Sequence, residues 1–162
     1  MSHWLHVAAA LGATRARLMA GRGDPTPDLI QECAGRLVRL ASAHPGVRIV
    51  IENWSGLMRD AQSVQAVVKA TDGAVGLLID LGNWRGPHKY EELARIAPLA
   101  ESCHAKCRFT GAVPDAEDFR RSLQVLKDAG YDGSLTLIYD GSDDDEWAKL
   151  ELEHELCSGV FG

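Results

Sequence analysis

Two carboxylates end apolar runs, at positions where a buried charge needs a partner. Glu52 falls at the end of residues 47–53, a short run rich in β-branched side chains, and Asp80 ends residues 74–80. Short runs of this type predict buried strands. An ionised carboxylate is costly to bury unless a metal ion, a substrate proton or an opposite charge neutralises it. For Glu52 alone, the simpler interpretation is a residue just past the strand, in solvent or beside an arginine.

A histidine stands at the same place in a third predicted strand. His104 lies near the end of residues 101–106. The carboxyl ends of consecutive parallel strands lie at one edge of a sheet, so we expect Glu52, Asp80 and His104 to converge. Two carboxylates and an imidazole form a hard donor set that suits Mn²⁺, Mg²⁺ or Co²⁺, with Zn²⁺ also possible. The sequence therefore predicts a divalent metal site.

Strands and helices alternate along the chain, which predicts an α/β fold with a parallel sheet. The strands are expected at residues 14–20, 47–53, 74–80, 101–106 and 134–140. The helices are expected at residues 3–11, 26–43, 60–71, 90–97, 115–129 and 143–157. Because no repeat, low-complexity stretch or linker interrupts this pattern, a single domain over residues 1–162 is expected.

The composition narrows the classes of function. The chain has 162 residues and a net charge of −6, with 46% hydrophobic and 25% charged residues, as in soluble globular proteins. Without a basic stripe, nucleic acid is not an expected partner. No apolar run is long enough to span a bilayer, so a membrane is not expected either. The four cysteines lack the spacing of a disulfide framework and predict reduced thiols in a cytoplasmic protein.

Four short motifs follow one another in a characteristic order. They are Ile51-Glu-Asn53, Asp80-Leu-Gly-Asn83, His104-Ala-Lys106 and Gly130-Tyr-Asp-Gly133. From about residue 10 to the C-terminus, their order and spacing resemble the sugar phosphate isomerase/epimerase family, which has the xylose-isomerase-like TIM barrel. The resemblance implies a metal held by Glu52, Asp80, His104 and a second glutamate.

The resemblance also implies a reaction on a small sugar or a related polyol-ketone. A proton next to a carbonyl would be transferred through a metal-bound enediolate. Glu52 would be both metal ligand and general base, and Lys106 would help electrostatically. Lys106 shares the predicted strand face of His104, and a salt bridge at the rim is the alternative role for it.

The second glutamate of the family pattern is missing. Its place falls on Ile138, which can neither bind a metal nor move a proton. Asp140 lies two residues farther along the chain, hence on the same strand face, and could serve as the fourth metal ligand at a shifted position. The simpler interpretation is that the fourth ligand is absent. The alternative to a sugar isomerase or epimerase is therefore a non-catalytic family remnant, or a subunit that works only in an assembly.

The length fits only part of a barrel. A (β/α)₈ barrel needs ~250 residues, and the five expected strands match the last five of the family. We therefore expect a partial TIM barrel of five parallel strands with outer helices. Its two open edges would be covered by homo-oligomerisation, by a partner chain or by strand exchange.

Three loop residues that follow the predicted metal ligands are candidates for substrate contact. Trp54 and Trp84 could form an apolar wall over a sugar ring, with plain packing as the alternative. Asn83 could touch substrate or only shape its turn. Cys103 and Cys107 flank His104, but Cys103 would face the opposite side of the strand, so buried thiols are the simpler interpretation for both.

Overall fold

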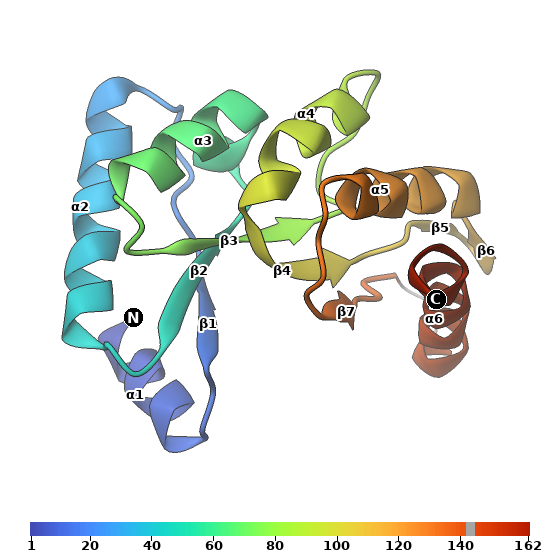
Figure 1. The fold of residues 1–162 in the computed structure, drawn as a ribbon, viewed down its shortest axis with the longest axis horizontal. Coiled ribbons are helices and arrows are strands. Elements are labelled where there is room, and N and C mark those ends of the chain that lie inside the picture. The colour runs from blue at the N-terminus through green and yellow to red at the C-terminus, as the bar shows by residue number, and fades with distance from the viewer. Residues whose placement is uncertain (142–144) are drawn as a thin grey trace. The chain divides into compact units, whose positions relative to one another are not determined.

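The structure is a computed structural model that describes residues 1–141 and 145–162. Its main sheet has five parallel strands in the order β1-β2-β3-β4-β7 (Figure 1). These strands are β1 (Arg15–Leu18), β2 (Arg48–Glu52), β3 (Gly76–Asp80), β4 (Ala100–Ala105) and β7 (Leu135–Leu137). The strand order follows the chain order, with a helix before each new strand, as in part of a (β/α)₈ barrel. The predicted partial TIM barrel is confirmed.

Helices alternate with the strands as predicted. The α-helices are α1 (Ser2–Ala10), α2 (Pro27–Ala43), α3 (Ala61–Ala70), α4 (Lys89–Ile96), α5 (Ala116–Asp128) and α6 (Glu146–Phe161), and the 3₁₀ turns are η1 (Gly56–Met58) and η2 (Ala97–Leu99). Thr26 caps α2 as expected, because its hydroxyl accepts from the N–H of Leu29 at 3.3 Å and Pro27 follows it. Gly130 adopts φ +79° just after α5, a conformation that favours glycine at a helix end.

Residues Met1–Leu78 form one compact unit. In it, β1 pairs with β2, and β2 pairs with β3 in a register that sets Glu52 opposite Leu78. Helices α2 and α3 lie side by side (Figure 1). Side chains of β2 and α3 supply much of the core, including Ile49, Ile51, Val64 and Val67.

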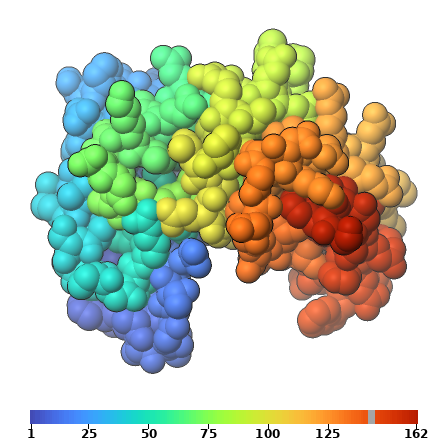
Figure 2. All heavy atoms as spheres, in the orientation of Figure 1, coloured from blue at the N-terminus to red at the C-terminus, as the bar shows by residue number. Residues whose placement is uncertain are grey.

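Residues Ile79–Gly162 form the second compact unit. Strand β4 pairs with β7, setting His104 opposite Thr136. Helix α5 packs on both α4 and α6, and Figure 2 shows the red spheres of α6 directly against the orange spheres of α5. The apolar face predicted for α5 is confirmed, because Phe119, Leu123 and Leu126 are all buried.

The structure differs from the expected elements near the C-terminus. Strand β7 covers three residues instead of the seven predicted, so Asp140 lies outside it. A short hairpin of β5 (Phe109–Thr110) and β6 (Val113–Pro114) was not predicted, because two-residue strands are too short to show periodicity. The expected start of the last helix at residue 143 lies outside the described residues. Among the described residues, no helix combines the length and apolar composition needed to cross a bilayer.

Candidate metal centre

Glu52 is the last residue of β2 and is only 7% exposed. Arg17, on the neighbouring strand β1, donates from Nη1 to Glu52 Oε2 at 2.8 Å. The guanidinium of Arg17 also lies 5.7 Å from the ring centre of Trp54, which is 44% exposed. An arginine therefore balances the buried charge of Glu52 and also forms a cation–π contact with the tryptophan that follows.

Asp80 ends β3 and is 2% exposed. Its Oδ1 accepts from the backbone N–H of Gly82 at 2.8 Å, which fixes the carboxylate at the start of the loop. Gly82 has no room for a side chain, because a Cβ there would lie 2.9 Å from the carbonyl oxygen of Lys106. The other oxygen, Oδ2, lies 3.6 Å from Nδ1 of His104, which is longer than a hydrogen bond.

His104 lies on β4 with its side chain 21% exposed, and Cys103 before it is 1% exposed. This alternation confirms that the two side chains face opposite sides of the strand. Burial raises the pKa of the Cys103 thiol well above its usual value, and the nearby Asp80 adds to the effect. The thiol is therefore protonated at neutral pH, which confirms the interpretation of Cys103 as a buried thiol.

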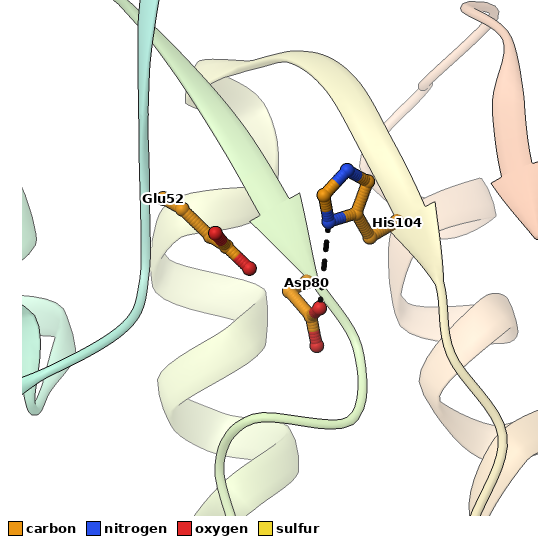
Figure 3. A group of neighbouring side chains, drawn as sticks. All are labelled: Glu52, Asp80 and His104. Atoms are coloured by element: carbon orange, nitrogen blue, oxygen red, sulfur yellow. Dashed lines mark ion pairs between the residues drawn. The ribbon is translucent and has the colours of Figure 1, made fainter. Parts of the chain in front are cut away.

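The three predicted ligands form a group. Glu52, Asp80 and His104 each offer one ligand atom, and these atoms lie within 4.8 Å of one another (Figure 3). Strand β3 explains the closeness of the carboxylates, because Glu52 pairs with Leu78 and Asp80 lies two residues farther along the same strand face. Two buried carboxylates and a partly exposed imidazole are a donor set that fits a hard divalent cation.

The other predicted site residues form contacts beside this group. Lys106 Nζ lies 2.6 Å from Asp140 Oδ2 and 3.4 Å from Asn83 Oδ1. Asp140 has a side chain 63% exposed and is not brought to the three-residue group. The short β7 explains this, because the strand ends at Leu137 and the pleat expected to orient Asp140 does not reach it. The indole nitrogen of Trp84 is buried and has no hydrogen-bond partner among the described residues.

Glu153 is a further buried acid, which the sequence did not single out. It lies in the middle of α6 with no exposed surface and accepts from the backbone N–H of Cys107 at 2.9 Å. This bond ties α6 to the segment that follows β4, while Glu153 Oε2 is buried with no hydrogen-bond partner among the described residues. Burial raises the pKa of Glu153 to about 7, although the hydrogen bond from the Cys107 backbone opposes this change.

The raised pKa of Glu153 predicts a pH-dependent stability. The ordinary pKa of a glutamate is 4.5. Between about pH 4.5 and pH 7, the folded protein therefore binds more protons than the unfolded chain. The resulting stability is complete below about pH 4.5 and is lost as the pH rises through about 7. We expect this group to lower the free energy of unfolding by up to roughly 3 kcal/mol between about pH 5 and pH 8. Glu153→Gln should flatten that decline in urea denaturation.

The matched control is Glu151→Gln, because Glu151 lies on the same helix and is exposed. It should leave the pH dependence of the unfolding free energy as in the parent protein. An identical decline in the parent and in Glu153→Gln would contradict the assigned role of this carboxyl group.

The sequence of this chain matches a family of known proteins. The sequence model described as xylose isomerase-like TIM barrel matches residues 1–155. The chain belongs to this family. No curated protein matches the sequence of this xylose isomerase-like barrel.

Two solved structures resemble the xylose isomerase-like barrel in fold. One is 3-keto-D-glucoside 4-epimerase, YcjR, from E. coli in its apo form, with a TM-score of 0.67 and 12% identity over 98% of this chain and 68% of that chain. The other is a xylose isomerase-like TIM barrel/4-hydroxyphenylpyruvate dioxygenase fusion protein, with a TM-score of 0.58 and 17% identity over 96% of this chain and 31% of that chain. At these identities the likeness shows the fold alone.

Proposed function

We propose that this protein is a metal-dependent sugar isomerase or epimerase-like enzyme that transfers a proton next to a carbonyl group. The observation that supports the proposal is the grouping of Glu52, Asp80 and His104 within 4.8 Å in a xylose isomerase-like barrel. The similar fold of YcjR, a 3-keto-D-glucoside 4-epimerase, is in keeping with a small sugar or sugar-like substrate.

Glu52, Asp80 and His104 would hold the divalent cation, with Mn²⁺, Mg²⁺ or Co²⁺ suited to the donors and Zn²⁺ also possible. When bound, such a cation polarises neighbouring sugar oxygens and makes the adjacent carbon-bound proton easier to remove. Asp80 is held for this role by the N–H of Gly82, which fixes one carboxylate oxygen at 2.8 Å.

Glu52 would act as the general base that accepts the carbon-bound proton. Its ion pair with Arg17 at 2.8 Å orients the carboxylate in a buried place. Lys106 would stabilise negative charge that develops on a substrate oxygen. With Ile138 in place of a second glutamate, one base would remove and return the proton on one face, which favours isomerisation over two-base epimerisation.

Loop residues after β2 and β3 would bind the sugar. Trp54 and Trp84 would present apolar surface to the ring, and Asn83 would bind a hydroxyl group. The indole N–H of Trp84 is buried and has no partner among the described residues.

Deuterium exchange tests this function directly. The Mn²⁺-loaded protein is incubated in D₂O with a panel of aldoses and ketoses, and ¹H NMR follows the proton next to the carbonyl. We expect exchange in at least one sugar, slowed by about 100-fold or more in Glu52→Gln. The control Glu117→Gln changes an exposed glutamate on α5 and should have no effect. Absent exchange, or exchange unaffected by Glu52→Gln, would contradict the proposal.

A second candidate function is a non-catalytic subunit or family remnant. Ile138 favours it, because an apolar side chain stands where the family pattern has its second glutamate. The backbone N–H at this position donates to the carbonyl oxygen of Ala105 at 3.3 Å. Metal binding without any deuterium exchange would support this candidate over the enzyme.

We also propose that residues 1–162 act as one domain in an assembly. The edges of the described sheet are β1 and β7, and an open edge presents backbone groups that pair readily with another chain. A second copy or a partner chain would cover them. Light scattering should give a mass of at least two chains of 17.6 kDa. A stable, folded monomer would contradict this prediction.

The four cysteines support a reducing location. Cys33, Cys103, Cys107 and Cys157 are all free and buried. Free thiols persist in reducing compartments. We therefore propose that the protein is cytoplasmic.

A further inference from the structure

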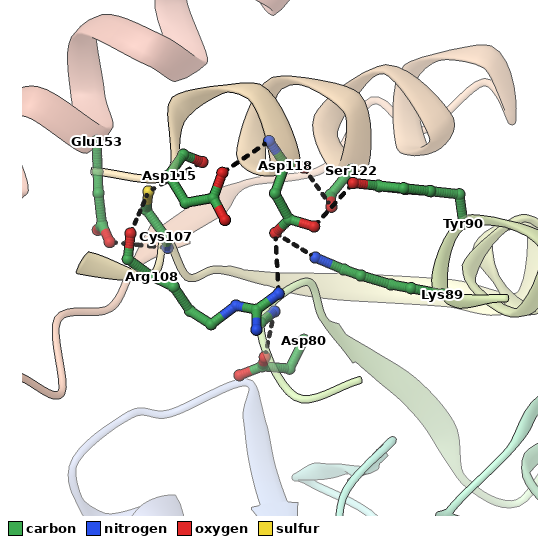
Figure 4. A network of polar contacts seen from close by, with 10 residues as sticks. Asp80, Lys89, Tyr90, Cys107, Arg108, Asp115, Asp118, Ser122 and Glu153 are labelled. Carbon is green, nitrogen blue, oxygen red and sulfur yellow. Dashed lines mark hydrogen bonds and ion pairs between the residues drawn. The ribbon is translucent and has the colours of Figure 1, made fainter. Parts of the chain in front are cut away.

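The side chain of Glu153 reaches from α6 to the segment that follows β4. It has no exposed surface, and its Oε1 accepts from the backbone N–H of Cys107 at 2.9 Å. Figure 4 shows the carboxyl group of Glu153 pointing at the backbone of Cys107. The other oxygen, Oε2, is buried and has no hydrogen-bond partner among the described residues. Because an acid buried with so few hydrogen bonds is costly, the packing of α6 does not by itself account for a glutamate here.

The N–H of Cys107 belongs to the same peptide group as the carbonyl of Lys106. Because a peptide group is planar, an acceptor that holds the N–H also fixes the direction of the carbonyl. That carbonyl oxygen lies against Gly82, where a Cβ atom would be only 2.9 Å away from it. Glu153 therefore fixes the atom against which the backbone of Gly82 packs.

Gly82 in turn holds a predicted metal ligand. Its N–H donates to Asp80 Oδ1 at 2.8 Å. One residue earlier, the N–H of Leu81 donates to the carbonyl oxygen of His104 at 3.1 Å, so the segment that starts at Asp80 runs alongside the end of β4. Glu153 and Asp80 are thus connected through two backbone segments that contact each other directly. All of these residues lie in the second compact unit.

We infer that Glu153 is a positioning residue that holds Asp80 in place to bind the metal ion. It acts through the Lys106–Cys107 peptide and the backbone of Gly82. The inference rests on the proposed function, which supplies the metal ion. Direct hydrogen-bond partners of metal ligands change metal affinity by roughly 10- to 100-fold, and Glu153 lies one step farther from the ion. Its effect should therefore be at the lower end of that range.

Mn²⁺ titration followed by electron paramagnetic resonance compares the parent protein with three variants. Glu153→Gln keeps an oxygen within reach of the Cys107 N–H and should bind Mn²⁺ as tightly as the parent. Glu153→Leu removes the acceptor and should weaken binding by about 10-fold. Glu153→Asp keeps a carboxyl group but withdraws it by one methylene, so it should weaken binding several-fold. It serves in place of Glu153→Leu if the leucine variant does not fold.

Hydrogen exchange of the Cys107 amide, measured by NMR without metal, is the second readout. Exchange should be about 10-fold or more faster in Glu153→Leu and Glu153→Asp, and unchanged in Glu153→Gln. The matched control is Cys157→Ala, which removes packing at a buried position of the same helix. It should lower the free energy of unfolding and leave the Mn²⁺ affinity as in the parent, because it removes no hydrogen bond to Cys107.

The outcomes separate this inference from the proposed function. Weaker Mn²⁺ binding in Glu153→Leu or Glu153→Asp, with parent-like binding in Glu153→Gln and Cys157→Ala, supports the positioning role even if no sugar undergoes deuterium exchange. Parent-like affinity in all the Glu153 variants would overturn this inference and leave the metal centre intact. An equal loss of affinity in Cys157→Ala would also overturn it, because a general loosening of α6 would then explain the effect. A parent protein that binds no Mn²⁺ would overturn the metal centre, and this inference with it.

Discussion

Asp118→Asn is expected to lower the free energy of unfolding by about 3 kcal/mol or more, because it leaves a buried ammonium group without its counterion. Lys89 has a side chain only 2% exposed, and its Nζ lies 2.6 Å from Asp118 Oδ2. Burial raises the pKa of Asp118, but hydrogen bonds from Lys89 and Tyr90 outweigh burial and lower it overall. Equilibrium urea unfolding at neutral pH measures the loss.

Two further variants show whether the cost comes from the orphaned charge. Asp128→Asn, at the exposed end of the same helix, should change stability little. The double variant Lys89→Met with Asp118→Asn should be more stable than Asp118→Asn alone, because it no longer buries an unpaired ammonium group. If the double variant is less stable than the single one, the buried ion pair does not have the role assigned here.

Addition of Mn²⁺ is expected to stabilise the parent protein by about 2.7 kcal/mol when the free ion is at about 100 times its dissociation constant. The reason is that only the folded chain brings Glu52, Asp80 and His104 within 4.8 Å. Chelation with EDTA should reverse the gain. Thermal or urea unfolding with and without the ion gives the difference.

Asp80→Asn and Glu52→Gln should each abolish most of this stabilisation, because an amide is a poorer ligand than a carboxylate. Asp132→Asn is the control, since Asp132 is exposed and lies in a loop away from the group. A gain in stability that is equal in the parent and both site variants would mean that the ion binds elsewhere.

The fold and the three grouped side chains could be predicted from the sequence because their signals are local. Apolar runs marked β2 and β3, alternation of side chains marked β1 and β7, and Thr26 with Pro27 marked the start of α2. Glu52 and Asp80 became recognisable as site residues because they and His104 fall at the same place in three consecutive predicted strands. Parallel topology then predicted that residues far apart in sequence would meet, and the structure confirms this for the three side chains.

The remaining features depend on contacts that no local pattern encodes. Glu153 is one acid among several on α6, and only packing shows that it is buried against the backbone of Cys107. Lys89 and Asp118 meet across 29 positions of sequence. Asp140 was expected on a strand face, but β7 is an edge strand that pairs only with β4 and ends early. The alternating pattern of residues 134–140 therefore predicted a longer strand than the three residues of β7.

Electron paramagnetic resonance of Mn²⁺, titrated into the parent protein and into Asp80→Asn, is the most direct test of the metal centre. The account predicts one bound ion per chain in the parent and roughly 100-fold or more weaker binding in the variant. No bound Mn²⁺ in the parent, or the same affinity in both proteins, would contradict a centre built from Glu52, Asp80 and His104.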